Sequence, residues 1–208
     1  AFTESNYINV VAGTVSGDTI TFGTPLVLYT GFTIGSDDCL NLIYEPVSGK
    51  CVAIFSDGSS SARTALVTVS GNSVSAATSS SFEGGIRFIR STLYTPDSSI
   101  VVSYEDQSDG GRIKATVMTV SGSSVSTGAP VIVNSGSGNS KTGIGYDPVQ
   151  DKIAVFYRAS SSNDGEVKVG TVSGNSLSFG SATAFETNGG NNDSPSVVFD
   201  SVNEKLVV

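Results

Sequence analysis

The sequence predicts an all-β protein built as a β-propeller, in which four-stranded sheets, or blades, of about 52 residues surround an axis. The first observation is an internal repeat. Four copies of the tripeptide Val-Ser-Gly, each preceded by Thr, begin at Val15, Val69, Val120 and Val172, after intervals of 54, 51 and 52 residues, and a fixed period near fifty residues is typical of repeat architectures. The second observation is composition, because Gly, Ser, Thr and Val dominate and no long segment follows the period of an α-helix.

Each repeat contains four strand signals, here called a to d. Strand d follows the Val-Ser-Gly turn, and a Gly-rich connection leads from it to strand a. A turn rich in Pro and Asp joins a to b. Strand b is an almost continuous apolar run, which predicts burial on both faces, and a polar hairpin leads from it to strand c. The expected strands are 19–29, 73–81, 124–133 and 176–186 for d, 39–44, 88–94, 141–146 and 196–199 for a, and 50–55, 100–104, 152–157 and 205–208 for b.

Four short strands joined in order form an antiparallel meander, which cannot bury both of its faces alone. Radial repetition packs each sheet against its neighbours; a β-sandwich is the alternative, although it would not require a repeat of this period. Residues 205–208 followed by 1–2 reproduce the pattern of strand b at 152–157. The fourth blade is therefore expected to be shared between the termini, or the chain is part of a larger array. We expect a single domain, 1–208, with repeat units of approximately 2–54, 55–103, 104–156 and 157–208.

Composition also limits the classes of function. The chain has 208 residues, of which 38% are hydrophobic, enough for one domain with a core. The formal net charge of −8 argues against a surface that binds nucleic acid or an anionic membrane. No apolar run is long enough to insert in a membrane, and nothing resembles a signal peptide.

Two residue types that often carry chemistry are absent from the sequence, and a third is scarce. There is no His, which excludes Ser–His and Cys–His nucleophiles, and no Trp, which weakens an aromatic platform for sugars. The cysteines are Cys39 and Cys51. The expected hairpin places Tyr44 opposite Cys51 and Cys39 opposite Ser56, so two free thiols are favoured over a disulfide.

Carboxylates and amides are expected to gather at one end of the blades. In a meander, the b–c hairpins and the d–a connections lie at the same end. Such a surface suits a protein partner, sugar hydroxyls or Ca²⁺; the alternative is solvated turns, in which Asp, Asn and Gly are common for backbone reasons. No metal site is expected, although Ca²⁺ at Asp106 and Asp109 is an alternative, since 106–110 is a fragment of a calcium loop. The candidate binding residues are Asp37, Asp38, Asp57, Asp106, Asp109, Asp164, Asn191, Asn192 and Asp193.

Two further sets of residues stand out against the repeat. Tyr44, Tyr94, Tyr146 and Phe199 end the four a strands and are expected to pack between blades. Arg87 and Arg90 have no counterparts in the other units, and are therefore the positive charges expected to have a role other than a structural one. The alternatives are counter-ions of the acidic face, or exposed charges at a sheet edge that discourage the addition of another strand.

The repeats resemble a known group of sequences. The unit 170–180, Gly-Thr-Val-Ser-Gly-Asn-Ser-Leu-Ser-Phe-Gly, and the turn Tyr146-Asp147-Pro148 leading to Lys152 are similar to propeller-type repeats of large surface, appendage or tail-fibre proteins of marine bacteria and their phages. The resemblance covers nearly the whole chain and implies extracellular or virion display, with no catalytic residues to transfer. The second repeat departs most, because Ser99 stands where the lysine is expected.

The functional expectation is a non-enzymatic structural or adhesive module. It would present its b–c and d–a loops to other subunits of an appendage or virion, or to cell-surface glycans. One alternative is a lectin-like propeller that binds glycans, with a similar pocket on several blades. A second is a glycosidase with an acidic pair near the propeller axis, an analogy at the level of the fold.

Overall fold

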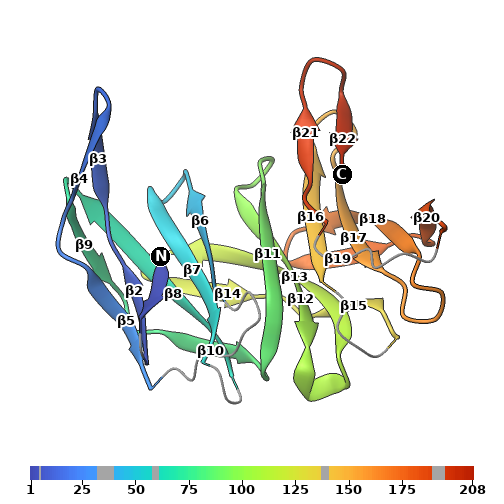
Figure 1. Ribbon diagram of the computed structural model, residues 1–208, viewed down its shortest axis with the longest axis horizontal. Coiled ribbons are helices and arrows are strands. Elements are labelled where there is room, and N and C mark those ends of the chain that lie inside the picture. Colours follow the sequence, from blue (N-terminus) through green and yellow to red (C-terminus); the bar gives the residue numbers. More distant parts are fainter. Residues whose placement is uncertain (5, 32–39, 58–60, 137–140, 189–194) are drawn as a thin grey trace.

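The computed structural model describes residues 1–4, 6–31, 40–57, 61–136, 141–188 and 195–208. Within them the protein consists of β-strands and one short 3-10 helix, Gln107–Asp109, so the expected all-β class is confirmed. Figure 1 shows small antiparallel sheets that follow one another across the molecule in chain order. No helix in the described part of the chain is long and apolar enough to cross a membrane.

Three five-stranded sheets lie between two smaller groups of strands, and we number the sheets in chain order. Sheet 1 contains β1 (Phe2–Glu4), β2 (Tyr7–Val10) and β5 (Leu26–Thr30), and the hairpin of β3 (Gly13–Ser16) and β4 (Thr19–Phe22) continues it. Sheet 2 contains β6 (Leu40–Glu45), β7 (Lys50–Ser56), β8 (Ala62–Ser70), β9 (Ser73–Ala76) and β10 (Ser80–Glu83). Sheet 3 contains β11 (Ile86–Tyr94), β12 (Ser99–Asp106), β13 (Arg112–Ser121), β14 (Ser124–Thr127) and β15 (Val131–Asn134). Sheet 4 contains β16 (Thr142–Asp147), β17 (Lys152–Arg158), β18 (Gly165–Ser173), β19 (Ser176–Phe179) and β20 (Thr183–Glu186), and a final hairpin joins β21 (Val198–Asp200) to β22 (Lys205–Val207).

The order of strands in each complete sheet is the expected a–b–c–d meander. In sheet 2, β6 pairs with β7 and β7 with β8, and the register places Tyr44 opposite Cys51 as predicted. Cys51 is a partly buried free thiol whose pKa is raised by burial. Cys39 lies outside the described residues.

Strand d differs from the expectation, because it is divided into two short strands in every unit. In sheet 2, both β9 and β10 pair with β8, and the pairing of β10 contains a register shift. At the break, Ala77 N still donates to Leu66 O at 2.9 Å. Three glycines at the same repeat position make this bond as well, at 2.8–3.0 Å: Gly23 to Ala12, Gly128 to Val117 and Gly180 to Val169. The division lets strand d follow the long strand c around a bend.

The core consists of three clusters, each between two successive sheets. Strand b is buried as predicted in sheets 2, 3 and 4, and all eight residues of β12 are buried. The prediction is wrong for 205–208, because no further sheet of the described chain packs over β22 and Val207 is exposed. Representative members are Ile8 with Phe55 between sheets 1 and 2, Ile54 with Tyr104 between sheets 2 and 3, and Ile113 with Val155 between sheets 3 and 4. Each sheet therefore buries its faces against its neighbours rather than within itself.

The two ends of the chain lie on different sides of the molecule. In Figure 1, sheet 1 is at the left, and β21 and β22 project at the right. β1 pairs with β2, and β22 pairs with β21. The described residues form no closed ring, and the strand expected to be shared between the termini is not assembled, because β21 and β22 pack beside β16 of sheet 4.

The b–c hairpins and d–a connections share one end, as predicted, wherever both are described. Gln107 N, in the hairpin after β12, donates to Gly85 O in the connection before β11, at 2.9 Å. A Cβ atom added to Gly136, in the next connection, would lie 1.7 Å from Ser160 Oγ in the following hairpin. These loops are therefore packed against each other in sheets 3 and 4.

Candidate functional site

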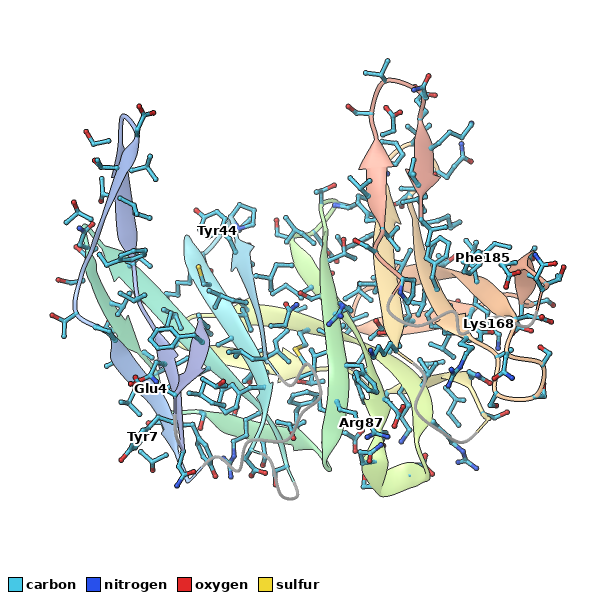
Figure 2. All side chains as sticks on the ribbon, viewed as in Figure 1. Glu4, Tyr7, Tyr44, Arg87, Lys168 and Phe185 are labelled. Atoms are coloured by element: carbon cyan, nitrogen blue, oxygen red, sulfur yellow. The ribbon has the colours of Figure 1, made fainter. Side chains whose placement is uncertain are left out.

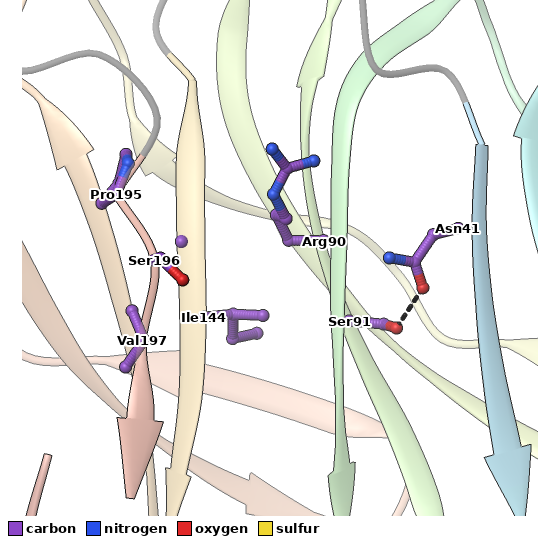
Figure 3. Close-up of a pocket in the computed structure, with 8 residues that line it drawn as sticks. Asn41, Arg90, Ser91, Ile144, Pro195, Ser196 and Val197 are labelled. Atoms are coloured by element: carbon purple, nitrogen blue, oxygen red, sulfur yellow. Dashed lines mark hydrogen bonds between the residues drawn. The ribbon is translucent and has the colours of Figure 1, made fainter. Parts of the chain in front are cut away.

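A pocket of about 250 Å³ lies where the first strands of successive sheets approach one another, and we call it the first-strand pocket. Figure 3 shows that β6, β11, β16 and the segment before β21 all contribute to it. The lining residues are Asn41, Arg90, Ser91, Gly143, Ile144, Pro195, Ser196 and Val197.

Four of the lining residues occupy one position of the repeat. Each stands three residues before the aromatic residue that ends strand a. The four are Asn41, Ser91, Gly143 and Ser196, which precede Tyr44, Tyr94, Tyr146 and Phe199. The same point of four successive units therefore faces a common space, although these residues are 50 to 53 positions apart in the chain.

A hydrogen bond joins two of these equivalent residues. Ser91 Oγ donates to Asn41 Oδ1 at 2.5 Å, across neighbouring first strands (Figure 3). Side chains at this position are small or absent, so the strands approach without filling the space between them. On the other side, a Cβ atom added to Gly143 would lie 2.6 Å from Pro195 O. Glycine thus lets the segment 195–197 close that wall of the pocket.

A bulge in β11 places the charged residue of the pocket. The pairing of β11 with β12 shifts between Arg87 and Arg90, and Phe88 within the shift has φ 53°. A positive φ is a true outlier for a bulky side chain and marks local strain. The carbonyl oxygen of Phe88 accepts from Thr142 Oγ1 of β16 at 3.2 Å, which holds the bulge against the next sheet. Bulges commonly redirect side chains in this way.

Positive charges gather around the bulge in an otherwise acidic protein. Arg90 lines the pocket, and its Nη1 donates to Ile89 O at 3.0 Å. Lys141 Nζ lies 5.7 Å from the centre of the Phe88 ring, and the guanidinium carbon of Arg87 lies 5.1 Å from it. Arg87, labelled in Figure 2, also forms an ion pair of 2.8 Å with the fully buried Glu105. Arg87 therefore stabilises the sheet, whereas Arg90 faces the pocket.

The predicted binding residues that the structure describes do not line this pocket. Asp57 is buried, and its carboxylate accepts from Ser61 N at 3.0 Å and pairs with Arg63 at 3.3 Å. Asp164 takes part in its hairpin through its backbone, since its carbonyl accepts from Ala159 N at 2.8 Å. Five of the nine predicted residues lie outside the described part of the chain: Asp37, Asp38, Asn191, Asn192 and Asp193.

Asp106 and Asp109 lie close together, and the carboxylates of both pair with the side-chain ammonium of Lys114. Asp106 caps the 3-10 helix, accepts from Ser108 N at 2.9 Å and pairs with Lys114 at 2.7 Å. Asp109 pairs with the same ammonium at 2.9 Å and with Arg112 at 3.0 Å. Hydrogen bonding to Lys114 lowers the pKa of Asp109. No group of three or more His, Cys, Asp or Glu side chains suited to a metal is found among the described residues, and a calcium site here stays a prediction.

Of the aromatic residues that end the a strands, two form a cluster between sheets 3 and 4. The rings of Tyr94 and Tyr146 are 5.2 Å apart and edge to face. Their hydroxyls donate to the two carboxylate oxygens of Asp151, at 3.0 and 3.1 Å. Burial, together with the bond to Asp151, raises the pKa of Tyr94 to about 12. Tyr44 does not follow this pattern, being 56% exposed at the tip of β6 (Figure 2).

The chemistry of the first-strand pocket is that of a binding site. Its described lining offers an amide, hydroxyls and a guanidinium beside two aliphatic side chains, and it includes no carboxylate. The acidic pair that a glycosidase requires is therefore not provided by these residues. Sequence reasoning singled out Arg90 because it breaks the repeat, but gave no signal for Asn41, Ser91 or Ser196.

Comparisons of this chain with known protein families, with curated proteins and with solved structures find no match.

Proposed function

We propose that the protein is a β-propeller-type repeat module that acts in adhesion, without catalysis, on an extracellular appendage or a virion. One observation carries the proposal: Asn41, Ser91, Gly143 and Ser196 hold the same repeat position and line the same pocket. Convergence of equivalent first-strand residues on a common space is expected when sheets are arranged around an axis. Such a scaffold is rigid and carries variable loops, which suits recognition.

The partners proposed for this module are other subunits of the appendage or virion, or glycans of a cell surface. The net charge of −8 disfavours nucleic acid as a partner. The b–c loop after β12 is held by local contacts of Asp109 with Arg112 and Lys114, so it offers a preformed surface. Preformed surfaces lose less conformational entropy on binding.

Glycan binding is the second candidate function, and the first-strand pocket favours it. Asn41, Ser91 and Arg90 provide hydrogen-bond donors and acceptors, while Ile144 and Val197 provide apolar walls. A space of about 250 Å³ is slightly below the usual range for ligand pockets, and suits one sugar residue rather than a long chain.

A glycan array probed with the labelled full-length chain tests both candidates. Saturable binding that Arg90→Met abolishes would support the pocket, and Arg112→Met, at an exposed ion pair of the b–c loop, is the matched control. If the chain binds intact cells and Arg90→Met leaves this binding unchanged, the b–c and d–a loops are favoured over the pocket as the binding surface. Mass spectrometry of the bound glycan follows in parallel, and release of a sugar would overturn the non-enzymatic proposal.

A further inference from the structure

Neighbouring sheets meet at their outer strands through a contact that recurs along the chain. A Cβ atom added to Gly23 of sheet 1 would lie 1.7 Å from the backbone oxygen of Asn72, in the turn between β8 and β9 of sheet 2. A Cβ atom added to Gly128 of sheet 3 would lie 2.0 Å from the backbone oxygen of Asn175, in the turn between β18 and β19 of sheet 4. The two glycines hold the same repeat position, as do the two asparagines. Only glycine allows so close an approach of the turn.

The asparagine side chains use both halves of their amide groups at these junctions. Asn72 Nδ2 donates to Thr21 O at 3.1 Å, and Asn72 Oδ1 accepts from Thr14 Oγ1 at 2.5 Å. Asn175, with its amide oriented to satisfy its neighbours, donates to Val117 O and accepts from Gly128 N, both at 3.2 Å. Each turn therefore needs an acceptor and an N–H donor at this position.

The middle junction lacks both members of the pair. Ala77 of sheet 2 stands at the glycine position, and Ser123 of sheet 3 stands at the asparagine position. This junction has a different bond, in which Lys50 Nζ donates to Gly122 O at 2.6 Å. Glycine and asparagine are thus present together or absent together, as expected of two halves of one contact.

Sheet 4 carries the glycine half of this contact, and no turn of the described chain is seated on it. Gly180 holds the position of Gly23 and Gly128, but among the described residues the one atom within 4 Å of its added Cβ is Val169 O, at 3.8 Å. Val169 is 49% exposed, whereas the equivalent Leu66 and Val117, which adjoining sheets cover, are 4% and 1% exposed. The hairpin of β21 and β22 packs near β16 and leaves this outer part of β18 and β19 uncovered.

Among the described residues, one turn between strands c and d has no neighbouring sheet to receive it. It is the turn between β3 and β4, where exposed Asp18 stands at the asparagine position. In Figure 1 this hairpin and β19 lie on opposite sides of the molecule, so they do not meet within one copy. Within the described residues, the β3–β4 turn and the face around Gly180 are therefore the two halves of this contact that have no partner in the same copy.

We propose that the face around Gly180 docks the β3–β4 turn of a second copy of this chain, giving head-to-tail association, and that Asp18 keeps this association weak. An ionised carboxylate accepts hydrogen bonds but cannot donate to a carbonyl such as Val169 O. The carbonyl is then left facing a negative charge, which Asn72 and Asn175 avoid at the internal junctions. A head-to-tail contact of this kind is heterologous and can repeat along a row of copies.

Sedimentation of the full chain over a range of concentrations tests the proposal, in about 0.15 M salt so that the net charge is screened. We expect Asp18→Asn to lower the dissociation constant for self-association by at least tenfold, since about 1.4 kcal/mol corresponds to that factor. Gly180→Val added to Asp18→Asn should return the chain to the monomer. Asp164→Asn, which makes the same change of charge at the opposite end of the sheets, is the matched control and should sediment as the wild type does.

Gly180→Val leaves the fold testable, because its added Cβ makes only an ordinary contact, with Val169 O at 3.8 Å, and its φ lies outside the left-handed region. An Asp18→Asn chain that stays monomeric at every concentration would overturn the proposal. Association of Asp18→Asn that persists when Gly180→Val is added would overturn it as well, by placing the contact elsewhere.

Discussion

Ser91 and Asn41 occupy the same position in neighbouring first strands, and the hydroxyl of Ser91 donates to the amide oxygen of Asn41 at 2.5 Å. This bond joins two sheets beside the first-strand pocket rather than within one sheet. It shows that the wall of the pocket is made by side chains that are 50 residues apart in the chain.

Removing the hydroxyl should loosen that wall. We expect Ser91→Ala to lower the free energy of unfolding by about 1 kcal/mol, the usual net contribution of such a bond. Urea denaturation followed by circular dichroism measures it. Ser196→Ala is the control, because Ser196 holds the same repeat position and has no hydrogen-bond partner among the described residues. Equal effects of the two substitutions would contradict a role for the bond.

Gly128 and Gly180 hold equivalent positions in different surroundings, which makes them a matched pair for a packing test. Gly128→Val forces a side chain against the backbone oxygen of Asn175, which cannot move aside as a flexible side chain would. We expect a loss of about 2 kcal/mol, typical of overpacking. Gly180→Val should change stability by less than about 0.5 kcal/mol, as surface substitutions do. Thermal melting of the two variants distinguishes these results, and similar melting temperatures would argue against the Gly128–Asn175 junction.

Stability should fall in alkaline solution because of the cluster of Tyr94, Tyr146 and Asp151. The pKa of Tyr94 is raised to about 12, first by burial and then by its bond to Asp151, while an unfolded tyrosine titrates near about 10. The folded protein therefore keeps a proton that the unfolded chain releases. The contribution is complete below about pH 10 and is lost as pH rises toward about 12.

Urea midpoints measured from pH 8 to pH 12 check this dependence. Tyr94→Phe removes the titrating group and should make the decline shallower, although Tyr104 and Tyr157, whose pKa values burial also raises, still contribute. A decline that is equally steep in Tyr94→Phe would mean that the cluster does not control it.

The sequence was sufficient for the features that depend on local pattern. The four strands of each repeat, the pairing of Tyr44 with Cys51 and the shared end of the b–c and d–a loops all follow from alternation, turn residues and the meander rule. The division of strand d could not be predicted, because it depends on how a strand follows the bend of its neighbour. The bulge at Phe88 could not be predicted either, because the Phe88 carbonyl is held by Thr142 of another sheet.

The candidate binding residues were harder to predict from the sequence than the strands were, and for a different reason. Asp57, Asp106 and Asp109 attract attention as clustered acids, but their partners Arg63 and Lys114 lie across a hairpin and appear only in the fold. The first-strand pocket is formed by one small residue from each of four units, and a small polar residue gives no signal alone. Aligning the units and asking which positions are equivalent would have been the one way to find it.

The buried strand b provides the strongest test of the strand assignment. Val155 of β17 is fully buried in the cluster between sheets 3 and 4. Val155→Asp places an unpaired charge there, and we expect a loss of at least about 4 kcal/mol, within the range that defines severe substitutions. Asp164→Ala should leave the melting temperature nearly unchanged, because the recorded bond of Asp164 to Ala159 uses the backbone carbonyl, which alanine retains. Thermal melting of the two variants shows which substitution lowers the stability more. A chain that tolerates Val155→Asp but unfolds with Asp164→Ala would require β17 to lie at the surface, and the stacking of sheets 3 and 4 around it would have to be abandoned.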